Sequence, residues 1–223
     1  MKANPYLVFD IETRALPLSR IKEKGLMPSF KAPSNYKDPD KIAAKEAEHE
    51  SEIMAKAALD ATLSEVCAIG IKREHDEAPI IMCNDGFDPK RDERLMLIDF
   101  WSYIRESLND DARIVGFNIY GFDLPYLIRR SWHHGITPVA AIRKGRYWND
   151  HHVYDLAEVW KLGDKNNFIS LDRISRFFGL GQKSGSGKDF AALLDSDKEA
   201  AYEYLRKDIQ LTEKLAFHLG IIE

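Results

Sequence analysis

The alternation of apolar and polar positions divides the chain into strand-like and helix-like segments. Apolar, β-branched runs predict five strands, at about residues 5–12, 64–73, 79–84, 112–118 and 151–156. Helical spacing predicts helices at about 38–61, 92–108, 122–135, 170–180 and 197–219. Three of the strands come early, and helices separate the later ones. This order predicts an α/β fold, a mixed five-stranded sheet flanked by helices.

Residues 14–62 interrupt this pattern directly after the first strand. Residues 13–37 have no periodicity and are rich in proline and glycine, which predicts a long loop. Asp38 and Pro39 then open a highly charged helix as N-cap and first helical residue. The apolar content of this stretch is too low for a core of its own. We therefore expect a single domain, 1–223, with an insertion at 14–62 that contains a charged helix.

Composition excludes several broad classes of protein. The 223 residues are 30% charged and 44% hydrophobic, which is typical of a globular domain. No apolar run approaches the ~20 residues that a membrane-spanning helix needs, and the N-terminus does not resemble a signal peptide. Cys67 and Cys83 both lie in strand-like segments and are expected to be buried free thiols in a reducing compartment. These features predict a cytoplasmic protein with no membrane partner.

Charge is distributed unevenly around a net value of −4. Residues 1–112 carry 16 basic and 22 acidic side chains, residues 113–188 carry 12 and 6, and residues 189–223 carry 4 and 8. A basic middle between acidic ends is compatible with a local phosphate-binding surface. Solvated helix faces produce the same pattern, so charge alone decides nothing.

Two acids stand at the end of the first strand. Asp10 and Glu12 are two residues apart, so the strand's period of two places both side chains on one face. Paired acids on a buried strand repel one another unless a cation lies between them. Alternatively, the strand has already ended and both residues are solvated in a turn. For an isolated pair of this kind, the turn is the better interpretation.

A third acid follows the fourth predicted strand. Asp123 lies near the start of a helix, where a carboxylate interacts favourably with the helix dipole without any further role. Its neighbours Asn118, Tyr120 and Phe122 add an amide and two aromatic rings at a strand-to-helix junction. Such groups suit contacts to a sugar and stacking on a base, and ligands bind at such junctions in α/β sheets.

The last predicted helix contributes a fourth acid. Tyr204 and Asp208 are four residues apart and therefore share a helix face, which Leu211 and Leu215 continue as an apolar stripe. Asp208 is thus expected at the packed face, although a surface acid beside Arg206 and Lys207 explains the sequence equally well. Four carboxylates from three elements could together hold two Mg²⁺ or Mn²⁺ ions, which prefer hard oxygen ligands. Paired ions of this kind support phosphodiester hydrolysis.

The order of these motifs resembles a known family. VFDIET (8–13), GFNIYGFDLPYL (116–127) and YLRKD (204–208) are similar to the motifs of DEDD-type 3′–5′ exonucleases with a ribonuclease-H-like fold. The chain most resembles stand-alone proteins related to the exonuclease domain of family-B DNA polymerases. The resemblance covers most of the chain outside 14–62. It implies hydrolysis of single-stranded 3′ ends, DNA in preference to RNA, with release of nucleoside 5′-monophosphates.

The resemblance also assigns roles to individual residues. It implies that two divalent ions, Mg²⁺ or Mn²⁺, are held by Asp10, Glu12, Asp123 and Asp208. Tyr204 marks the tyrosine subtype, since the position that holds histidine in the other subtype is Glu203. With an ordinary pKa of ~10, Tyr204 is better suited to orienting water than to acting as a base. The expected substrate-binding residues are Thr13, Asn118, Phe122, Lys183 and Lys188.

Lys183 and Lys188 lie in GQKSGSGKD, which looks superficially like a phosphate-binding loop of nucleotide hydrolases. The segment follows a helix rather than a strand and has no Ser or Thr after Lys188, so that interpretation is rejected. A loop whose lysines touch substrate phosphate remains an open hypothesis.

Two alternative functions stay open. An exoribonuclease is hard to distinguish, because the 2′-OH is read by details of the site that sequence does not reveal. A catalytically silent nucleic-acid-binding module would be favoured if the acids lay far apart or were paired with Arg and Lys. The chain is too short to contain a polymerase domain, which leaves a replication or repair polymerase as a possible partner in trans.

Overall fold

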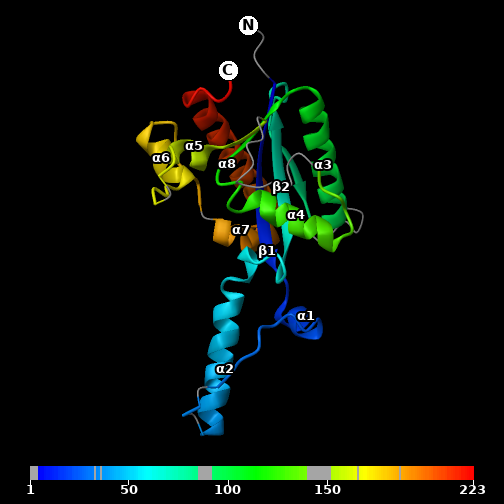
Figure 1. Cartoon of the computed structure of the whole chain (residues 1–223), viewed down its shortest axis with the longest axis vertical. Helices are drawn as coiled ribbons and strands as arrows, with labels where there is room; N and C mark the ends of the chain where they lie inside the picture. Colours follow the sequence, from blue (N-terminus) through cyan, green and yellow to red (C-terminus); the bar gives the residue numbers. More distant parts are fainter. Residues whose placement is uncertain are drawn as a thin grey trace. The chain divides into compact units, whose positions relative to one another are not determined.

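A five-stranded sheet forms the centre of the fold (Figure 1). The computed structural model describes residues 5–32, 34–35, 37–84, 92–139, 152–164, 166–185 and 187–223. The strands are β1 (Tyr6–Ala15), β2 (Ser64–Arg73), β3 (Ile80–Cys83), β4 (Arg113–Gly116) and β5 (Val153–Asp155). Their order is β3-β2-β1-β4-β5, with β4 parallel to β1 and β5, and β3 antiparallel to β2. The predicted mixed α/β sheet flanked by helices is confirmed.

The helices match the sequence pattern in most places. They are α1 (Leu18–Glu23), α2 (Pro39–Met54), α3 (Glu93–Asn109), α4 (Asp123–His133), α5 (Leu156–Lys161), α6 (Leu171–Phe177), α7 (Phe190–Ser196) and α8 (Lys198–His218). Short 3₁₀ turns cover Ala57–Leu59 and Gly187–Asp189. Asp38 caps α2 by accepting a hydrogen bond from the Asp40 amide, and Pro39 opens the helix, as its sequence predicts.

Two local predictions were wrong. The stretch 13–37, expected to be a loop, contains α1, whose Ile21 is fully buried. The charged helix ends at Met54 rather than near residue 61, and a 3₁₀ turn follows. No element was predicted for residues 190–196, which form α7 with Phe190 and Leu194 in the core. In α1 and α7, burial of a few apolar side chains stabilises helices that are too short to be stable alone.

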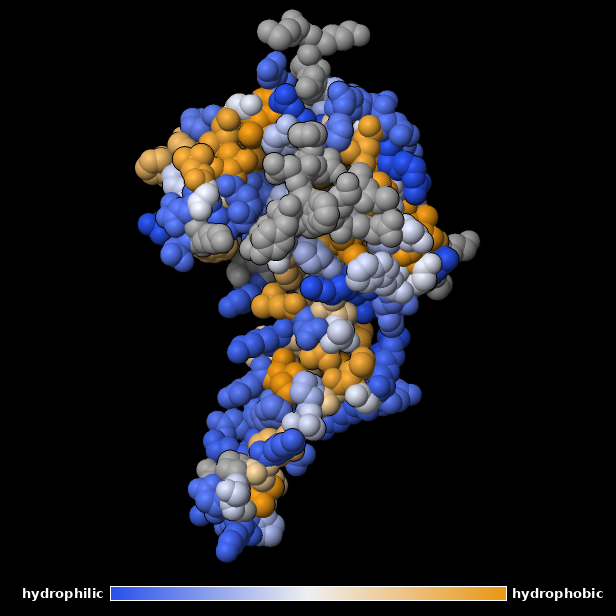
Figure 2. Space-filling model, in the orientation of Figure 1, coloured by the Kyte–Doolittle hydropathy of each residue, from blue (hydrophilic) through white to orange (hydrophobic). Residues whose placement is uncertain are grey.

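The chain separates into two compact units, Met1–Glu12 with Val66–Glu223, and Thr13–Glu65. The second unit contains the residues of the expected insertion, 14–62. Contrary to expectation it has a small core of its own, formed by Leu16, Ile21, Ala57 and Leu63. Arg14 pairs with Glu65 at 2.7 Å. No residue of α2 is buried, and Figure 2 shows mainly hydrophilic residues along it.

Strand β1 is buried on both faces, and its alternation determines which residues meet which helix. Tyr6 and Val8 belong to the core that also contains Leu205 and Ile209 of α8. The ring of Phe9, on the opposite face, lies 5.2 Å from that of Phe100 on α3. Residues of β1 with even numbers therefore face α8.

A glycine brings α8 close to the sheet. A Cβ atom on Gly70 of β2 would lie 2.8 Å from Ile209 Cδ1 and 3.0 Å from Leu205 Cγ. Any larger residue there would have to displace α8 or repack its side chains. The small residue thus fixes the distance between the helix and the strands.

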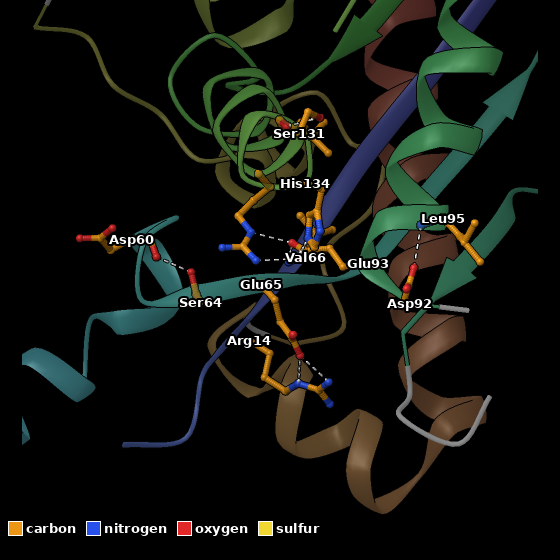
Figure 3. A network of polar contacts seen from close by, with 12 residues as sticks. Arg14, Asp60, Ser64, Glu65, Val66, Asp92, Glu93, Leu95, Ser131 and His134 are labelled. Atoms are coloured by element: carbon orange, nitrogen blue, oxygen red, sulfur yellow. Dashed lines mark hydrogen bonds and ion pairs between the residues drawn. The ribbon is translucent and has the colours of Figure 1, made fainter. Parts of the chain in front are cut away.

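A buried charge network joins β2, α3 and α4 on the other side of the sheet (Figure 3). Both oxygens of Glu93 are used. Oε1 accepts from the Val66 amide at 2.8 Å and from Arg130 Nε at 2.8 Å, while Oε2 accepts from Arg130 Nη2 at 2.6 Å. His134 Nε2 lies 2.7 Å from Oε2. Burial raises the pKa of Glu93, but hydrogen bonds from Arg130 and His134 outweigh it and lower the pKa below its usual value.

Breaking this network should destabilise the fold strongly. Arg130→Met leaves the Glu93 carboxylate, 5% exposed at its side chain, without its main counter-charge. We expect a loss of about 3–5 kcal/mol in the free energy of unfolding, measured by urea denaturation. As a control, Lys207→Met removes an exposed partner of Glu203 and should cost less than about 1 kcal/mol. Equal losses in the two variants would contradict this.

Candidate metal and nuclease site

Three acids meet where β1 passes under α8. Because even-numbered residues of β1 face α8, Asp10 and Glu12 both point toward that helix. One carboxylate oxygen from each of Asp10, Glu12 and Asp208 lies within 4.8 Å of the others. Asp10 is partly buried, while Glu12 and Asp208 are 7% and 1% exposed. The turn alternative for the DxE pair is therefore wrong, since β1 continues through Glu12 to Ala15.

Helix α8 supplies Asp208 and Tyr204 from one face. Tyr204, Leu211 and Leu215 are all buried in the same core, so the apolar stripe lies against the sheet as its spacing predicts. Among the described residues, the Tyr204 hydroxyl and both carboxylate oxygens of Asp208 are buried without a hydrogen bond of good geometry. These atoms therefore retain the capacity to bind a ligand.

Asp123 stands next to this cluster at the first residue of α4. It is 3% exposed, and its Oδ1 accepts a hydrogen bond from the Ile11 amide at 3.2 Å. Burial raises the pKa of Asp123 well above its ordinary value, and the charge of Asp10 adds to the shift. The structure thus places all four predicted acids around residues 10–12 of β1, with Asp123 beside Asp10.

Lys183 brings a positive charge into the cluster. Its Nζ lies 2.6 Å from Asp208 Oδ2 and 5.6 Å from the centre of the Tyr204 ring. An acid paired with lysine was the sign expected of a silent module. However, three carboxylates facing one ammonium still leave an excess of negative charge, which a divalent cation could balance.

The electrostatics of the site follow from burial and crowding. Burial raises the pKa of Asp10 to about 6, Asp208 adds to the shift and Lys183 opposes it. Burial, followed by the charge of Asp10, raises the pKa of Glu12 well above its ordinary value. Burial raises the pKa of Asp208, although the charge of Lys183 opposes the shift. Burial and the charge of Asp208 raise the pKa of Tyr204 beyond the range of a general base. In all four groups burial is the largest cause of the shift, and at Asp10, Glu12 and Tyr204 the charge of neighbouring carboxylates adds to it.

The residues fit a divalent metal. The cluster consists of oxygen donors alone, the set that Mg²⁺ and Mn²⁺ prefer. Asp10, Glu12 and Asp208 could hold an ion, and the unpartnered Asp208 Oδ1 offers it a lone pair.

Asp155 is a positioning residue that sequence reasoning missed. It is 2% exposed, and its carboxylate accepts from the amides of Asn118 at 2.7 Å, Tyr120 at 2.9 Å and Ala157 at 3.0 Å. The turn that it holds places Asn118 in the left-handed region, with φ of 59°. An Asp immediately before a short helix was the available signal, but it indicates only an N-cap.

Besides Lys183, the predicted substrate-binding residues are described by their contacts within the fold. A Cβ on Gly121 would lie 2.4 Å from Asn118 Oδ1, so the amide is packed against its own turn. Phe122 is partly buried, with its ring 5.3 Å from that of Tyr126. Within its own unit, Thr13 donates a hydrogen bond to the Ala58 carbonyl at 2.6 Å. Lys188 is exposed in the 3₁₀ turn. Their contacts with substrate stay predictions.

Comparison with known proteins identifies the family. Residues 57–213 match the model of a family described as "Predicted 3'-5' exonuclease related to the exonuclease domain of PolB". This is more than half of the chain, so the chain belongs to that family, and the expected resemblance is confirmed. Asp123, Lys183, Tyr204 and Asp208 lie inside the matched range, whereas Asp10 and Glu12 precede it.

Solved structures support the same fold. A family B DNA polymerase from the hyperthermophilic archaeon Pyrobaculum calidifontis is similar with a TM-score of 0.59 and 20% identity. The similarity covers 97% of this chain and 24% of the polymerase, so the chain spans about a quarter of that protein. A comparison with curated protein sequences gives no significant match.

Within the described residues, no helix has the length and apolar character to span a membrane.

Removing the Asp155 carboxylate should loosen the turn that carries Asn118. Asp155→Ala leaves three backbone amides without their acceptor, and we expect unfolding free energy to fall by about 2–4 kcal/mol. Asp155→Asn keeps one carbonyl oxygen and should lose less. Thermal and urea unfolding of both variants would test this, and equal stability of Asp155→Ala and wild type would contradict it.

The metal-free protein should lose stability as pH rises. The pKa of Asp10 is higher in the folded protein, at about 6, than in the unfolded chain, so protonation of Asp10 stabilises the fold. This contribution is fully present below the unfolded pKa and is lost as pH rises through about 6. In EDTA, Asp10→Asn should match wild type near pH 4 and exceed its unfolding free energy by up to about 3 kcal/mol at pH 8. Urea titrations at several pH values measure this. A difference independent of pH would contradict the assigned cause.

Proposed function

We propose that the chain is a metal-dependent 3′–5′ exonuclease that shortens single-stranded nucleic acid, DNA in preference to RNA. The proposal is supported mainly by the acid cluster, in which carboxylate oxygens of Asp10, Glu12 and Asp208 lie within 4.8 Å of one another and Asp123 lies beside them. The preference for DNA rests on the family's relation to a DNA polymerase domain. A polymerase or repair protein acting in trans remains the proposed kind of partner.

The acids would hold two divalent ions, Mg²⁺ or Mn²⁺. Such ions activate water and stabilise the charge that develops on the attacking and leaving oxygens of a phosphodiester. Asp10 and Glu12 provide ligands from a rigid central strand, Asp208 from α8, and Asp123 from the start of α4. Gly70 of β2 lets α8 pack closely on the sheet that contains β1, which would keep Asp208 close to Asp10 and Glu12.

Tyr204 would orient the water that attacks the last phosphodiester. Its hydroxyl is buried and unpartnered among the described residues, so it can donate or accept toward a water in the site. Its raised pKa keeps the hydroxyl protonated at neutral pH, which rules out a role as general base. Attack on the 3′-terminal linkage would release nucleoside 5′-monophosphates.

Asn118 and Phe122 are proposed to contact the terminal nucleotide, and Thr13, Lys183 and Lys188 the strand that precedes it. The support for Asn118 and Phe122 is their place in the turn just ahead of Asp123. Cys67 and Cys83 are both buried, and neither forms a disulfide within the described part of the chain. The proposed place of action is a reducing compartment such as the cytoplasm.

Asp208→Asn should abolish cleavage while the fold persists. Loss of a ligand should reduce the rate by more than about a hundredfold, beyond the usual cost of losing a group that only orients a ligand. The matched control is Glu203→Gln, which removes an acid from the exposed face of the same helix and should keep activity within about twofold of wild type. The assay follows 5′-labelled single strands of DNA and RNA, with Mg²⁺, Mn²⁺ or EDTA.

A metal-dependent ladder that shortens from the 3′ end supports the proposal, and its rate on each strand identifies the preferred sugar. Faster cleavage of RNA would make the protein an exoribonuclease. Binding without cleavage of either strand, in wild type as in Asp208→Asn, would establish the silent module instead.

A further inference from the structure

Lys183 is held in the acidic cluster from both ends of the residue. Its backbone amide donates to Asp172 Oδ1 at 2.9 Å, and this carboxylate in turn pairs with Arg176 on α6. Its ammonium reaches Asp208 Oδ2 at 2.6 Å, where the carboxylate is 1% exposed. The lysine side chain as a whole is 26% exposed, so it is only partly covered by the protein.

The segment around Lys183, residues 181–185 and 187–189, also lies against the other groups of the site. A Cβ on Gly185 would be 3.4 Å from Tyr204 Cε2, and a Cβ on Gly187 would be 3.2 Å from Glu12 Oε2. The segment therefore contacts a metal-binding acid and the catalytic tyrosine through glycines. Side chains at these positions would crowd both groups.

A metal ion and Lys183 would compete for the same carboxylate, because Lys183 pairs with Oδ2 of Asp208 and Oδ1 is the oxygen left for an ion. In the structure, Lys183 Nζ lies 2.6 Å from Asp208 Oδ2, and Asp10 and Glu12 each bring a carboxylate oxygen within 4.8 Å of one on Asp208. A divalent ion bound to Asp208 would approach that ammonium to within a few ångströms. Two positive charges at such a distance in a partly buried site repel one another, so binding of the ion would favour displacement of the ammonium.

We propose that Lys183 is an exchangeable counter-ion of the metal centre, which holds Asp208 in the metal-free protein and leaves it when an ion binds. Lys183 thereby sets the affinity for the metal, and its departure loosens the segment around it. This inference rests on the proposed metal site, and it concerns metal binding rather than catalysis.

Lys183→Met removes the charge and keeps most of the side chain. We expect Mn²⁺, titrated calorimetrically into metal-free protein, to bind about tenfold more tightly to this variant, because no ammonium must be displaced. Lys207→Met is the matched control, since it removes a lysine next to Asp208 in sequence but on the exposed face of α8, and should bind Mn²⁺ as wild type does. Equal or weaker binding by Lys183→Met would overturn the inference.

A second measurement needs no variant. Hydrogen exchange of the wild-type amides in 181–185 and 187–189 should become faster on saturation with Mn²⁺, while amides of β1 become slower or stay unchanged. Unchanged or slower exchange in the segment would also overturn the inference. If wild type binds no Mn²⁺, the proposed metal site fails. If wild type binds and Asp208→Asn does not, but Lys183→Met behaves as wild type, only the role of Lys183 fails.

Discussion

The mutual repulsion of buried carboxylates is the constraint on which this molecule depends. Asp10, Glu12 and Asp208 converge from a strand and a helix that are far apart in sequence, and Asp123 adjoins them. Every one of these acids has a raised pKa, so the folded chain bears an electrostatic cost at neutral pH. A positive charge relieves it, either Lys183 or a metal ion. The same unrelieved charge that weakens the metal-free fold is what would give a cation its affinity.

Such a cluster persists only if the surrounding elements resist moving apart. Strand β1 lies in the interior of the sheet and is buried on both faces, so it cannot rotate its acids into solvent without exposing Val8 or Phe9. Gly70 lets α8 approach the sheet closely, which fixes the height of Asp208 above β1. On the opposite face, the Glu93–Arg130 network ties α4 to α3 and β2, and α4 carries Asp123. Stability is thus concentrated in the elements that carry the acids.

The sequence was sufficient for the sheet, most helices and the acids, because each depends on a local pattern. Period two placed Asp10 with Glu12, and period 3.6 placed Asp208 on the packed face. It was insufficient where contacts span many residues. Ile21 and Phe190 nucleate helices through tertiary packing, and Asp155 holds a turn 35 residues away. Whether Asp10 met Asp208 at all depended on the approach of α8, which no local pattern encodes. The resemblance to a family supplied that link.

The distribution of charge along the sequence likewise does not reveal which charged residues pair with one another in the fold. The basic middle of the chain, residues 113–188, suggests a surface for phosphates when it is counted as a block. Two of its cations have other tasks in the fold, since Arg130 neutralises buried Glu93 and Lys183 neutralises buried Asp208. Both pair with acids from the acidic blocks on either side. Part of the excess positive charge in this block therefore pairs with buried acids of the other two blocks. Buried acids need such partners, because an unpaired charge is costly in the interior. A block of like charges in a sequence can therefore contain side chains that neutralise buried groups as well as side chains that bind a ligand at the surface.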